Sequence, residues 1–281
     1  HSWLTGSRLV SLPFSDHCDP LVSDAEEWEC LKQGLEAERD KGYDYIEWRP
    51  RGSLLRVPAG FRPSQTFCFH RLDLRPSLQE LFAKFHKDSV QRKIRRAERE
   101  GLTCAEGSSE ELLNKFYDLQ LSTRLRHGLP PQPRRWFQNL TECMGEQLNI
   151  RVASKNDTPV ASILTLRFKN TLMYKYGCSD ARFFNLGGLQ LLLWRAIENA
   201  KESGAEELDL GRSDTDDEGL IVFKDRWAAE RSQLTYFRCP MQVSRNVFNG
   251  RNWSKTATRI SSHIPYCVVS TAGKHLYRHF G

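Results

Sequence analysis

Residues 171–224, TLMYKYGCSDARFFNLGGLQLLLWRAIENAKESGAEELDLGRSDTDDEGLIVFK, decide the fold class. Their pattern predicts a strand over 171–180, an apolar helix over 181–204 and a second short strand over 205–214. A loop follows, and a second helix is predicted over 219–229, where the chain returns to the core. This alternation of strand, helix and strand is typical of an α/β (α+β) fold.

Asn185, Gly187 and Gly188 mark the start of the apolar helix. Glycines between a strand and a helix leave backbone N–H groups uncovered, and such groups can hold the phosphate of a donor substrate. The same glycines are also expected where a helix packs closely on a sheet. Both interpretations stay open.

The N-terminal stretch RLVSLPFSDHCDPL (8–21) predicts an apolar strand that ends in a polar loop. Four consecutive polar residues, 16–19, cannot all point at one ion, so we expect no metal site here. We expect Asp16 and His17 to face a substrate at the mouth of a cleft. A helix is predicted next, from Ser23 to Gly42, with Trp28, Leu31 and Leu35 on its inner face.

A helix is predicted from Pro76 to Gly101, apolar in its first half and cationic in its second. Clustered cations attract phosphate and make this helix a candidate RNA contact, although charged helix faces are often simply solvated. The candidate RNA-contact residues are Lys84, Lys87, Arg92, Lys93, Arg95 and Arg96.

The second half of the chain repeats the order of elements found in the first. Ser108 and Ser109 are expected to cap a helix over 110–127, and a further helix is predicted over 134–144. Residues 148–177 predict an antiparallel meander. A last strand is predicted over 231–240. The repeated order suggests a duplicated α/β unit, although the sequence holds no residue-level repeat.

Composition limits the class of protein. Of the 281 residues, 39% are hydrophobic, and this hydrophobic content is ample for a folded core. The formal net charge is +6. The eight cysteines are scattered singly, so we expect reduced thiols and a cytoplasmic location. No apolar run approaches the roughly 20 residues that a membrane span needs. The first residues contain no initiator Met, and we expect the chain to start inside a longer reading frame.

Six segments together resemble one known family. They are RLVSLPFSDHCDPL, SVQRKIRRAEREGL, LQLSTRLRHGLPPQP, YKYGCSD, LDLGRSD and GLIVFKDRWAA. In this order they are similar to the FemAB/FemX-related tandem GNAT-like transferases, and most of all to the FemAB-like branch found in bacterial exopolysaccharide/PEP-CTERM clusters. The resemblance covers nearly the whole chain.

The resemblance implies two tandem GNAT-like domains with mixed, mostly antiparallel sheets flanked by helices. We expect the first domain at 1–107, truncated at its N-terminus, and the second at 108–240, with the donor and catalytic site. A helical tail is expected at 241–281. Better-known members of the family transfer an amino acid from an aminoacyl-tRNA to an amine of a peptidoglycan precursor, so the resemblance implies an acyltransferase.

The resemblance also implies roles for individual residues. The family's Phe-Lys pair matches Phe223 and Lys224, and its lysine stabilises the oxyanion that develops at the reacting carbonyl. Asp209 and Arg212 follow a strand, where site residues are common in α/β folds, but they could instead form a structural ion pair. The further candidate substrate-binding residues are Arg124, Arg126 and Arg134, for acceptor phosphates, and Tyr174 or Tyr176.

Two departures from the family leave the donor open. The GNAT phosphate loop usually reads Arg/Gln-x-x-Gly-x-Gly/Ala, and Asn185 stands here where the first glycine belongs. The coiled-coil arm implicated in tRNA contact has no counterpart in this sequence. We expect no tightly bound cofactor, aminoacyl-tRNA or acyl-CoA as co-substrate, and an amine acceptor with tRNA as a candidate partner. A non-catalytic ligand-binding protein is the third alternative.

Overall fold

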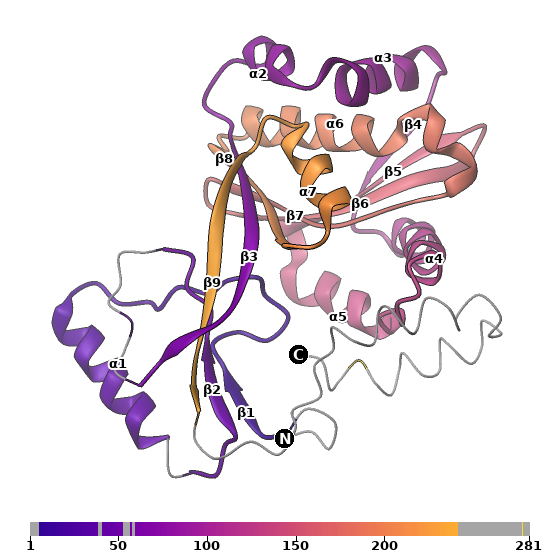
Figure 1. Cartoon of the computed structure of the whole chain (residues 1–281). Coiled ribbons are helices and arrows are strands. Elements are labelled where there is room, and N and C mark those ends of the chain that lie inside the picture. The colour runs from indigo at the N-terminus through magenta and orange to yellow at the C-terminus, as the bar shows by residue number, and fades with distance from the viewer. Residues whose placement is uncertain (1–5, 39–40, 53–56, 58–59, 241–276, 278–281) are drawn as a thin grey trace.

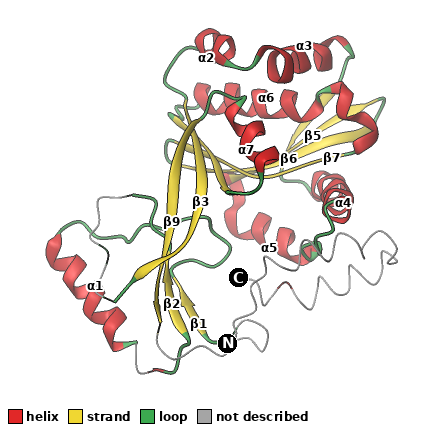
Figure 2. Ribbon diagram, in the orientation of Figure 1, coloured by secondary structure: helices red, strands yellow, loops and turns green. Residues whose placement is uncertain are grey.

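In the computed structural model, which describes residues 6–38, 41–52, 57, 60–240 and 277, nine strands form one mixed sheet (Figures 1 and 2). The order across the sheet is β1-β2-β9-β3-β8-β7-β6-β5-β4. The strands are β1 (Arg8–Val10), β2 (Tyr45–Trp48), β3 (Arg62–Asp73), β4 (Thr103–Gly107), β5 (Leu148–Lys155), β6 (Thr158–Phe168), β7 (Thr171–Ser179), β8 (Glu207–Asp214) and β9 (Glu230–Pro240).

Helices cover both faces of the β4–β8 half of the sheet. Figure 1 shows α6 on one face with α2 and α3 stacked over it, and α4 and α5 on the other face. The helices are α1 (Ala25–Ala37), α2 (Leu78–Lys84), α3 (Arg92–Arg99), α4 (Glu110–Arg126), α5 (Arg134–Met144), α6 (Gly188–Glu202) and α7 (Glu218–Asp225), with short turns η2 (Lys87–Gln91), η3 (Gly145–Gln147) and η4 (Ala181–Leu186).

Most neighbouring strands are antiparallel, as expected, and the meander β5–β6–β7 is confirmed. Its two turns use left-handed backbone at Asn156, Asp157 and Lys169. Among the strands that the structure describes, only β1–β2 and β7–β8 pair in parallel. The β7–β8 pair is parallel because α6 carries the chain back across the sheet between the two strands.

One continuous sheet joins the two predicted domains. Strand β3 belongs to the first predicted domain, yet it lies between β8 and β9 of the second. Strand β9 also pairs with β2. A tandem of two separate domains is therefore not what the described residues display, and the boundaries at 107/108 and 240/241 stay predictions. The predicted tail, apart from Tyr277, lies outside the described residues.

The single helix predicted from Pro76 to Gly101 is wrong. Helix α2 ends at Lys84, and Phe85 takes an extended conformation with a ψ of 147°. The Phe85 ring is buried against Trp194 and Trp227, at centroid distances of 5.7 and 5.0 Å. Burying this ring redirects the chain, and His86 restarts the helix by accepting from the Ser89 N–H through Nδ1. A tertiary contact overrides local helix propensity here.

No helix in the described part of the chain combines the length and the apolar surface that crossing a bilayer requires.

Candidate functional site between strands β7 and β8

Strands β7 and β8 pair over three residues and then separate. The paired residues are Thr171–Met173 and Glu207–Asp209. From there β7 continues beside β6 and β8 continues beside β3. Strand β8 carries one residue more than β3 between Asp209 and Arg212, and Gly211 has a φ of +71°. This bulge bends β8 away from β7. We call the region beyond the paired residues the β7–β8 split.

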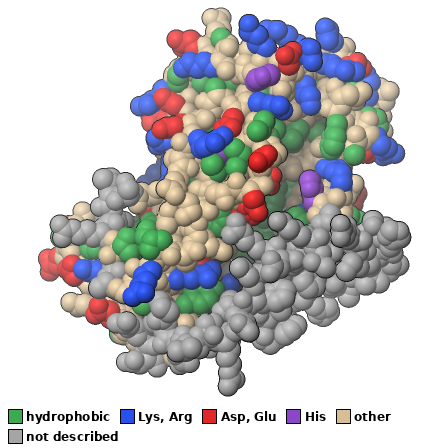
Figure 3. Space-filling model, viewed as in Figure 1, with side chains coloured by type: hydrophobic (Ala, Val, Ile, Leu, Met, Phe, Trp, Pro, Cys, Tyr) green, Lys and Arg blue, Asp and Glu red, His purple; other side chains and the backbone are tan. Residues whose placement is uncertain are grey.

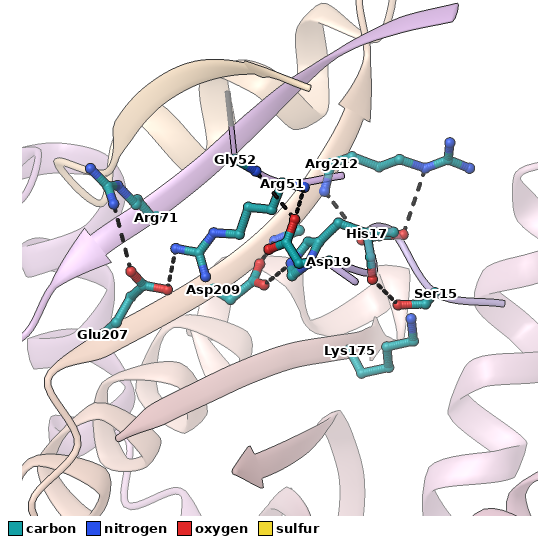
Figure 4. A network of polar contacts seen from close by, with 12 residues as sticks. Ser15, His17, Asp19, Arg51, Gly52, Arg71, Lys175, Glu207, Asp209 and Arg212 are labelled. Carbon is teal, nitrogen blue, oxygen red and sulfur yellow. Dashed lines mark hydrogen bonds and ion pairs between the residues drawn. The ribbon is translucent and has the colours of Figure 1, made fainter. Parts of the chain in front are cut away.

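The loop that follows β1 crosses the β7–β8 split (Figure 4). On the β7 side, Lys175 Nζ donates to the Phe14 carbonyl over 3.0 Å. On the β8 side, the Arg212 N–H donates to Asp16 Oδ2 over 3.2 Å. The loop is further held by the Tyr236 hydroxyl, which donates to the Asp16 carbonyl. The two strands that no longer pair with each other are thus bridged by one polar loop.

His17 and Asp209 form a close pair within this bridge. His17 Nε2 lies 2.9 Å from Asp209 Oδ2, and the Asp209 side chain is only 2% exposed. The other carboxylate oxygen accepts from the Gly211 N–H over 2.6 Å. Because an ionised carboxylate only accepts, Nε2–H is the donor, and in the neutral imidazole Nδ1 then holds the lone pair. An imidazole oriented in this way can take a proton from an attacking amine.

Arg212 does not form the ion pair with Asp209 that the sequence left as an alternative. Its guanidinium lies 3.6 Å from Asp16 and 4.1 Å above the Phe67 ring centroid. It also lies 5.1 Å above the ring of Tyr236. The bulge separates the two residues, so Asp209 binds His17 while Arg212 turns to Asp16 and to the aromatic rings.

Lys224 reaches the bulge from α7. Its Nζ donates to the carbonyls of Gly211 and Arg212, each over 2.9 Å, and the residue is 2% exposed. Burial lowers the pKa of Lys224 to about 8, and the carboxylates of Asp16 and Asp209 oppose that fall. An ammonium has three N–H donors, and the two carbonyls take two of them. The third can donate to an oxygen that gains negative charge.

A cavity of about 240 Å³ opens at the N-terminus of α6. Phe223, the neighbour of Lys224, lines it together with Gly188 and Lys93. Backbone N–H groups at a helix start and a lysine are an arrangement that attracts phosphate. Asn185 lies in the preceding turn η4 and is not among the residues that line the cavity.

Close packing accounts for both glycines at the start of α6. Gly187 has a φ of +79°, and a Cβ there would overlap the carbonyl oxygen of Lys93. A Cβ on Gly188 would lie 3.1 Å from the Cβ of Ala161. The packing interpretation is therefore sufficient for these residues, and phosphate binding by them stays a prediction.

We expect Gly187→Ala to lower the free energy of unfolding by about 2–3 kcal/mol, because it combines left-handed strain with a clash against backbone. Gly204→Ala is the matched control, since Gly204 has a φ of +85° with nothing within 4 Å of an added Cβ. In urea unfolding, the free energy of unfolding of the control should be lower than that of the wild type by about 1 kcal/mol. Equal losses would show that the Lys93 contact is unimportant.

The three candidate arginines lie in different settings. Arg126 donates to the Ser179 carbonyl at the end of β7 and stacks on Phe184, and both of those residues line the α6 cavity. Arg124 donates twice to the Pro130 carbonyl. Arg134 is bonded to α4 through the residues Glu110 and Asn114. Arg126 alone of the three borders the cavity.

The two candidate tyrosines point into different surroundings. The Tyr174 hydroxyl lies so close to Gly177 that a Cβ added to Gly177 would overlap it. Burial raises the pKa of Tyr174. The Tyr176 hydroxyl accepts from Trp136 Nε1 over 3.3 Å. The pKa of Tyr176 is also raised, mainly by burial. Both are neutral donors at physiological pH.

The basic residues of the α2–α3 region do not form one uniform face. Figure 3 shows blue side chains gathered over the top of the molecule, where α2 and α3 lie. Lys84 and Lys87 are exposed, whereas Lys93 lines the α6 cavity. The other three have partners within the chain: Arg92 with Asp88, Arg95 over the Phe82 ring, and Arg96 with Glu100.

Sequence reasoning missed several residues that hold the bridge. Lys175 and Tyr236 bind the loop, and Arg49 donates to the Ser15 carbonyl over 3.0 Å. Lys175 lies within YKYGCSD, so the motif itself was a signal for it. Tyr236 lies within β9 and Arg49 directly follows β2, both far in sequence from the loop, and no local pattern distinguishes them.

The sequence of this chain matches a known domain family. Residues 84–224, about half of the chain, match the acetyltransferase (GNAT) domain. The chain belongs to the GNAT acetyltransferase-domain family. The matched region holds β7, α6, β8 and most of α7, including Lys224. It begins at Lys84, so β1 to β3 and the loop with Asp16 and His17 lie outside it. No curated protein sequence matches the chain significantly.

Solved structures share the fold of this GNAT family member at low sequence identity. FemX is 15% identical with a TM-score of 0.63, over 82% of this chain and 79% of FemX. The C-terminal domain of a candidate lysylphosphatidylglycerol synthetase from Agrobacterium fabrum is 16% identical with a TM-score of 0.59, over 90% and 81% of the two chains. L-PGS from Bacillus licheniformis is 15% identical with a TM-score of 0.50, over 83% and 78%.

Proposed function

We propose that this protein transfers an aminoacyl or acyl group from an activated donor to an amine, and that the β7–β8 split is its active site. The observation that carries the proposal is Lys224, a buried cation beside the His17–Asp209 pair with one N–H donor to spare. Membership of a family of acetyltransferase domains supports acyl transfer as the reaction.

The proposal assigns a residue to each step of amide formation. The amine attacks the donor carbonyl, and the carbonyl oxygen gains negative charge that the third N–H of Lys224 stabilises. His17 accepts the proton that the amine loses, while Asp209 holds the imidazole in place. Phe223, which lines the α6 cavity, is proposed to contact the donor beside the reacting carbonyl. When the carbonyl re-forms, the donor's ester or thioester bond breaks, and the carrier leaves with the proton that His17 returns to its oxygen or sulfur.

Aminoacyl-tRNA is the donor that we propose first. The FemAB/FemX resemblance of the sequence and the likeness in fold to FemX support it. The exposed cations Lys84 and Lys87 offer contacts to RNA phosphates. The acceptor is an amine such as that of a cell-envelope precursor, and the proposal includes a cytoplasmic location because charged tRNA is found there.

Acyl-CoA is the second candidate donor, and one observation favours it. The α6 cavity places Lys93 beside the N-terminus of α6, an arrangement suited to a pyrophosphate. CoA should then raise the melting temperature of the protein in proportion to the logarithm of its concentration. Stabilisation by CoA with no binding of tRNA would favour this donor.

Mass spectrometry of reaction products tests the proposal directly. A mixture of small amines and envelope precursors is incubated with the protein and either charged tRNA or acyl-CoA. A mass gain equal to the aminoacyl or acyl group identifies donor and acceptor together. If neither donor yields product while a ligand still binds saturably, the protein is a binding member of the fold and the proposed transfer is refuted.

Neutralising exposed cations tests the tRNA donor. We expect Lys84→Gln combined with Lys87→Gln to weaken tRNA binding and to reduce the slope of log K against log salt by about two, because each phosphate contact contributes roughly one unit. Lys169→Gln, in the exposed β6–β7 turn, is the control and should leave the slope unchanged. An unaltered slope in the double variant would place tRNA elsewhere.

A further inference from the structure

A large apolar pocket lies between α1 and strands β1 and β2, away from the β7–β8 split. Its volume is about 810 Å³, within the range of small-molecule sites. Its walls include Trp28, Leu31 and Leu35 from α1, and Leu9, Ile46 and Trp48 from the two strands. None of the residues assigned above to catalysis or to donor binding lines it.

Helix α1 contacts β2 through Trp28 and Trp48, whose ring centroids lie 5.6 Å apart, and turns the rest of its apolar stripe to this pocket. The sequence predicts Trp28, Leu31 and Leu35 as the buried face of the helix, yet only Trp28 is buried and Leu31 remains 37% exposed. Gly34 also lines the pocket, and a Cβ added there would meet nothing within 4 Å. Leu21 is fully exposed where it lines the pocket. In a globular protein, the apolar stripe of an amphipathic helix is normally packed against the hydrophobic core.

The pocket has carboxylates in its wall, but each of them is already bonded within the chain. The bonds are Glu47 to Arg49 and Arg238, Asp19 to the Arg51 N–H, Glu27 to the Ser23 N–H, and Glu38 to Lys41. Glu47 and Glu38 are thus paired with cations, and Asp19 and Glu27 are exposed to water, so none of the four is a buried carboxylate that needs a charged ligand. What the pocket offers is hydrocarbon and aromatic surface, which favours an apolar ligand.

We propose that this pocket binds the hydrocarbon chain of a single-chain amphiphile. Leu21, at the rim, leaves room for a polar head group to remain in water while the chain lies along α1. One wall of the pocket, residues 18–22, follows directly after His17, so the bound chain rests against the loop that bridges the β7–β8 split. The proposal concerns binding and holds whether or not the protein transfers an acyl group.

Isothermal titration calorimetry with octan-1-ol, decan-1-ol and dodecan-1-ol, each below its solubility limit, tests the proposal. These probes carry no charge, so affinity reports chain burial. Each added pair of methylenes should strengthen binding about tenfold. Absence of saturable binding by all three alcohols would overturn the proposal, and so would an affinity that does not change with chain length.

Gly34→Leu and Gly34→Ala locate the binding site. Leucine at 34 fills the pocket, whereas alanine adds one carbon, and both improve helix propensity, so both variants should fold. We expect Gly34→Leu to weaken dodecan-1-ol binding at least tenfold and Gly34→Ala to leave it within about threefold. Equal affinities of the two variants would show that the alcohol binds elsewhere.

Tryptophan quenching provides a second measurement. 12-Bromododecan-1-ol should quench part of the fluorescence of the protein, and Trp28→Phe should remove part of that quenching, because Trp28 lines the pocket. Leu31→Glu, at the half-exposed edge of the stripe, should weaken binding by charging the pocket. Quenching that survives both substitutions unchanged would contradict the assignment. These assays need no turnover, so their failure is distinguishable from failure of the proposed transfer reaction.

Discussion

Replacing Lys224 with methionine is expected to lower kcat for the transfer reaction by about two to three orders of magnitude. The reason is the loss of one preorganised donor to the developing oxyanion, a change of about 2.7–4 kcal/mol in the barrier. Methionine keeps a similar length and apolar stem, so the core around α7 stays filled. Product formation is measured by mass spectrometry under single-turnover conditions with either donor.

Lys201→Met is the matched control for that variant. Lys201 Nζ also donates to two backbone carbonyls, those of Leu74 and Arg75, over 2.8 and 3.0 Å. It lies on α6, away from the β7–β8 split, so its loss removes the same kind of contact without touching the reacting atoms. We expect kcat within about threefold of wild type. A similar loss in both variants would mean that Lys224 only ties α7 to β8.

The free energy of unfolding of the wild type, relative to Lys224→Met, is expected to rise by about 3 kcal/mol between pH 8 and pH 10.5. Burial lowers the pKa of Lys224 from 10.5 to about 8, so in this window the unfolded chain binds a proton that the folded chain has released. Stability therefore increases with pH across the window. Below pH 8 the folded protein bears the full cost of a buried ammonium.

Urea unfolding of both proteins at half-unit steps of pH measures this difference. Other groups titrate in both proteins and cancel in the comparison, including Tyr236, whose pKa burial raises to about 12. A relative stability that stays flat from pH 8 to 10.5 would show that Lys224 has its ordinary pKa. This result would also remove the desolvated cation on which the catalytic proposal rests. The measurement requires neither donor nor acceptor.

Local elements of the fold could be predicted because their signals are local. Ser109 caps α4 by accepting from the Leu112 N–H, as its position before an apolar helix suggested. The meander and α7 likewise follow alternation and helical periodicity. The break at Phe85 could not be predicted, because it depends on two tryptophan rings more than 100 residues further along the chain.

The candidate site divides in the same way. Their own motifs indicate Lys224, Asp209 and His17 as candidate site residues. Nothing in those motifs shows that His17 bonds Asp209 or that Lys224 binds the bulge carbonyls. Arg134 is a predicted phosphate ligand only because of the segment of the sequence in which it lies. Its bonds to Glu110 and Asn114 belong to the contact between α4 and α5.

The sequence by itself determined the α/β class, the resemblance to acyl-transferring proteins and the residue types that could do the chemistry. These follow from hydrophobic periodicity and from motifs, which are properties of neighbouring residues. Only the tertiary structure decided that one sheet joins both halves, that the loop with His17 crosses the β7–β8 split, and that Lys224 is buried at the bulge of β8. Strand pairing and desolvation arise between segments far apart in the chain, so no local pattern contains them.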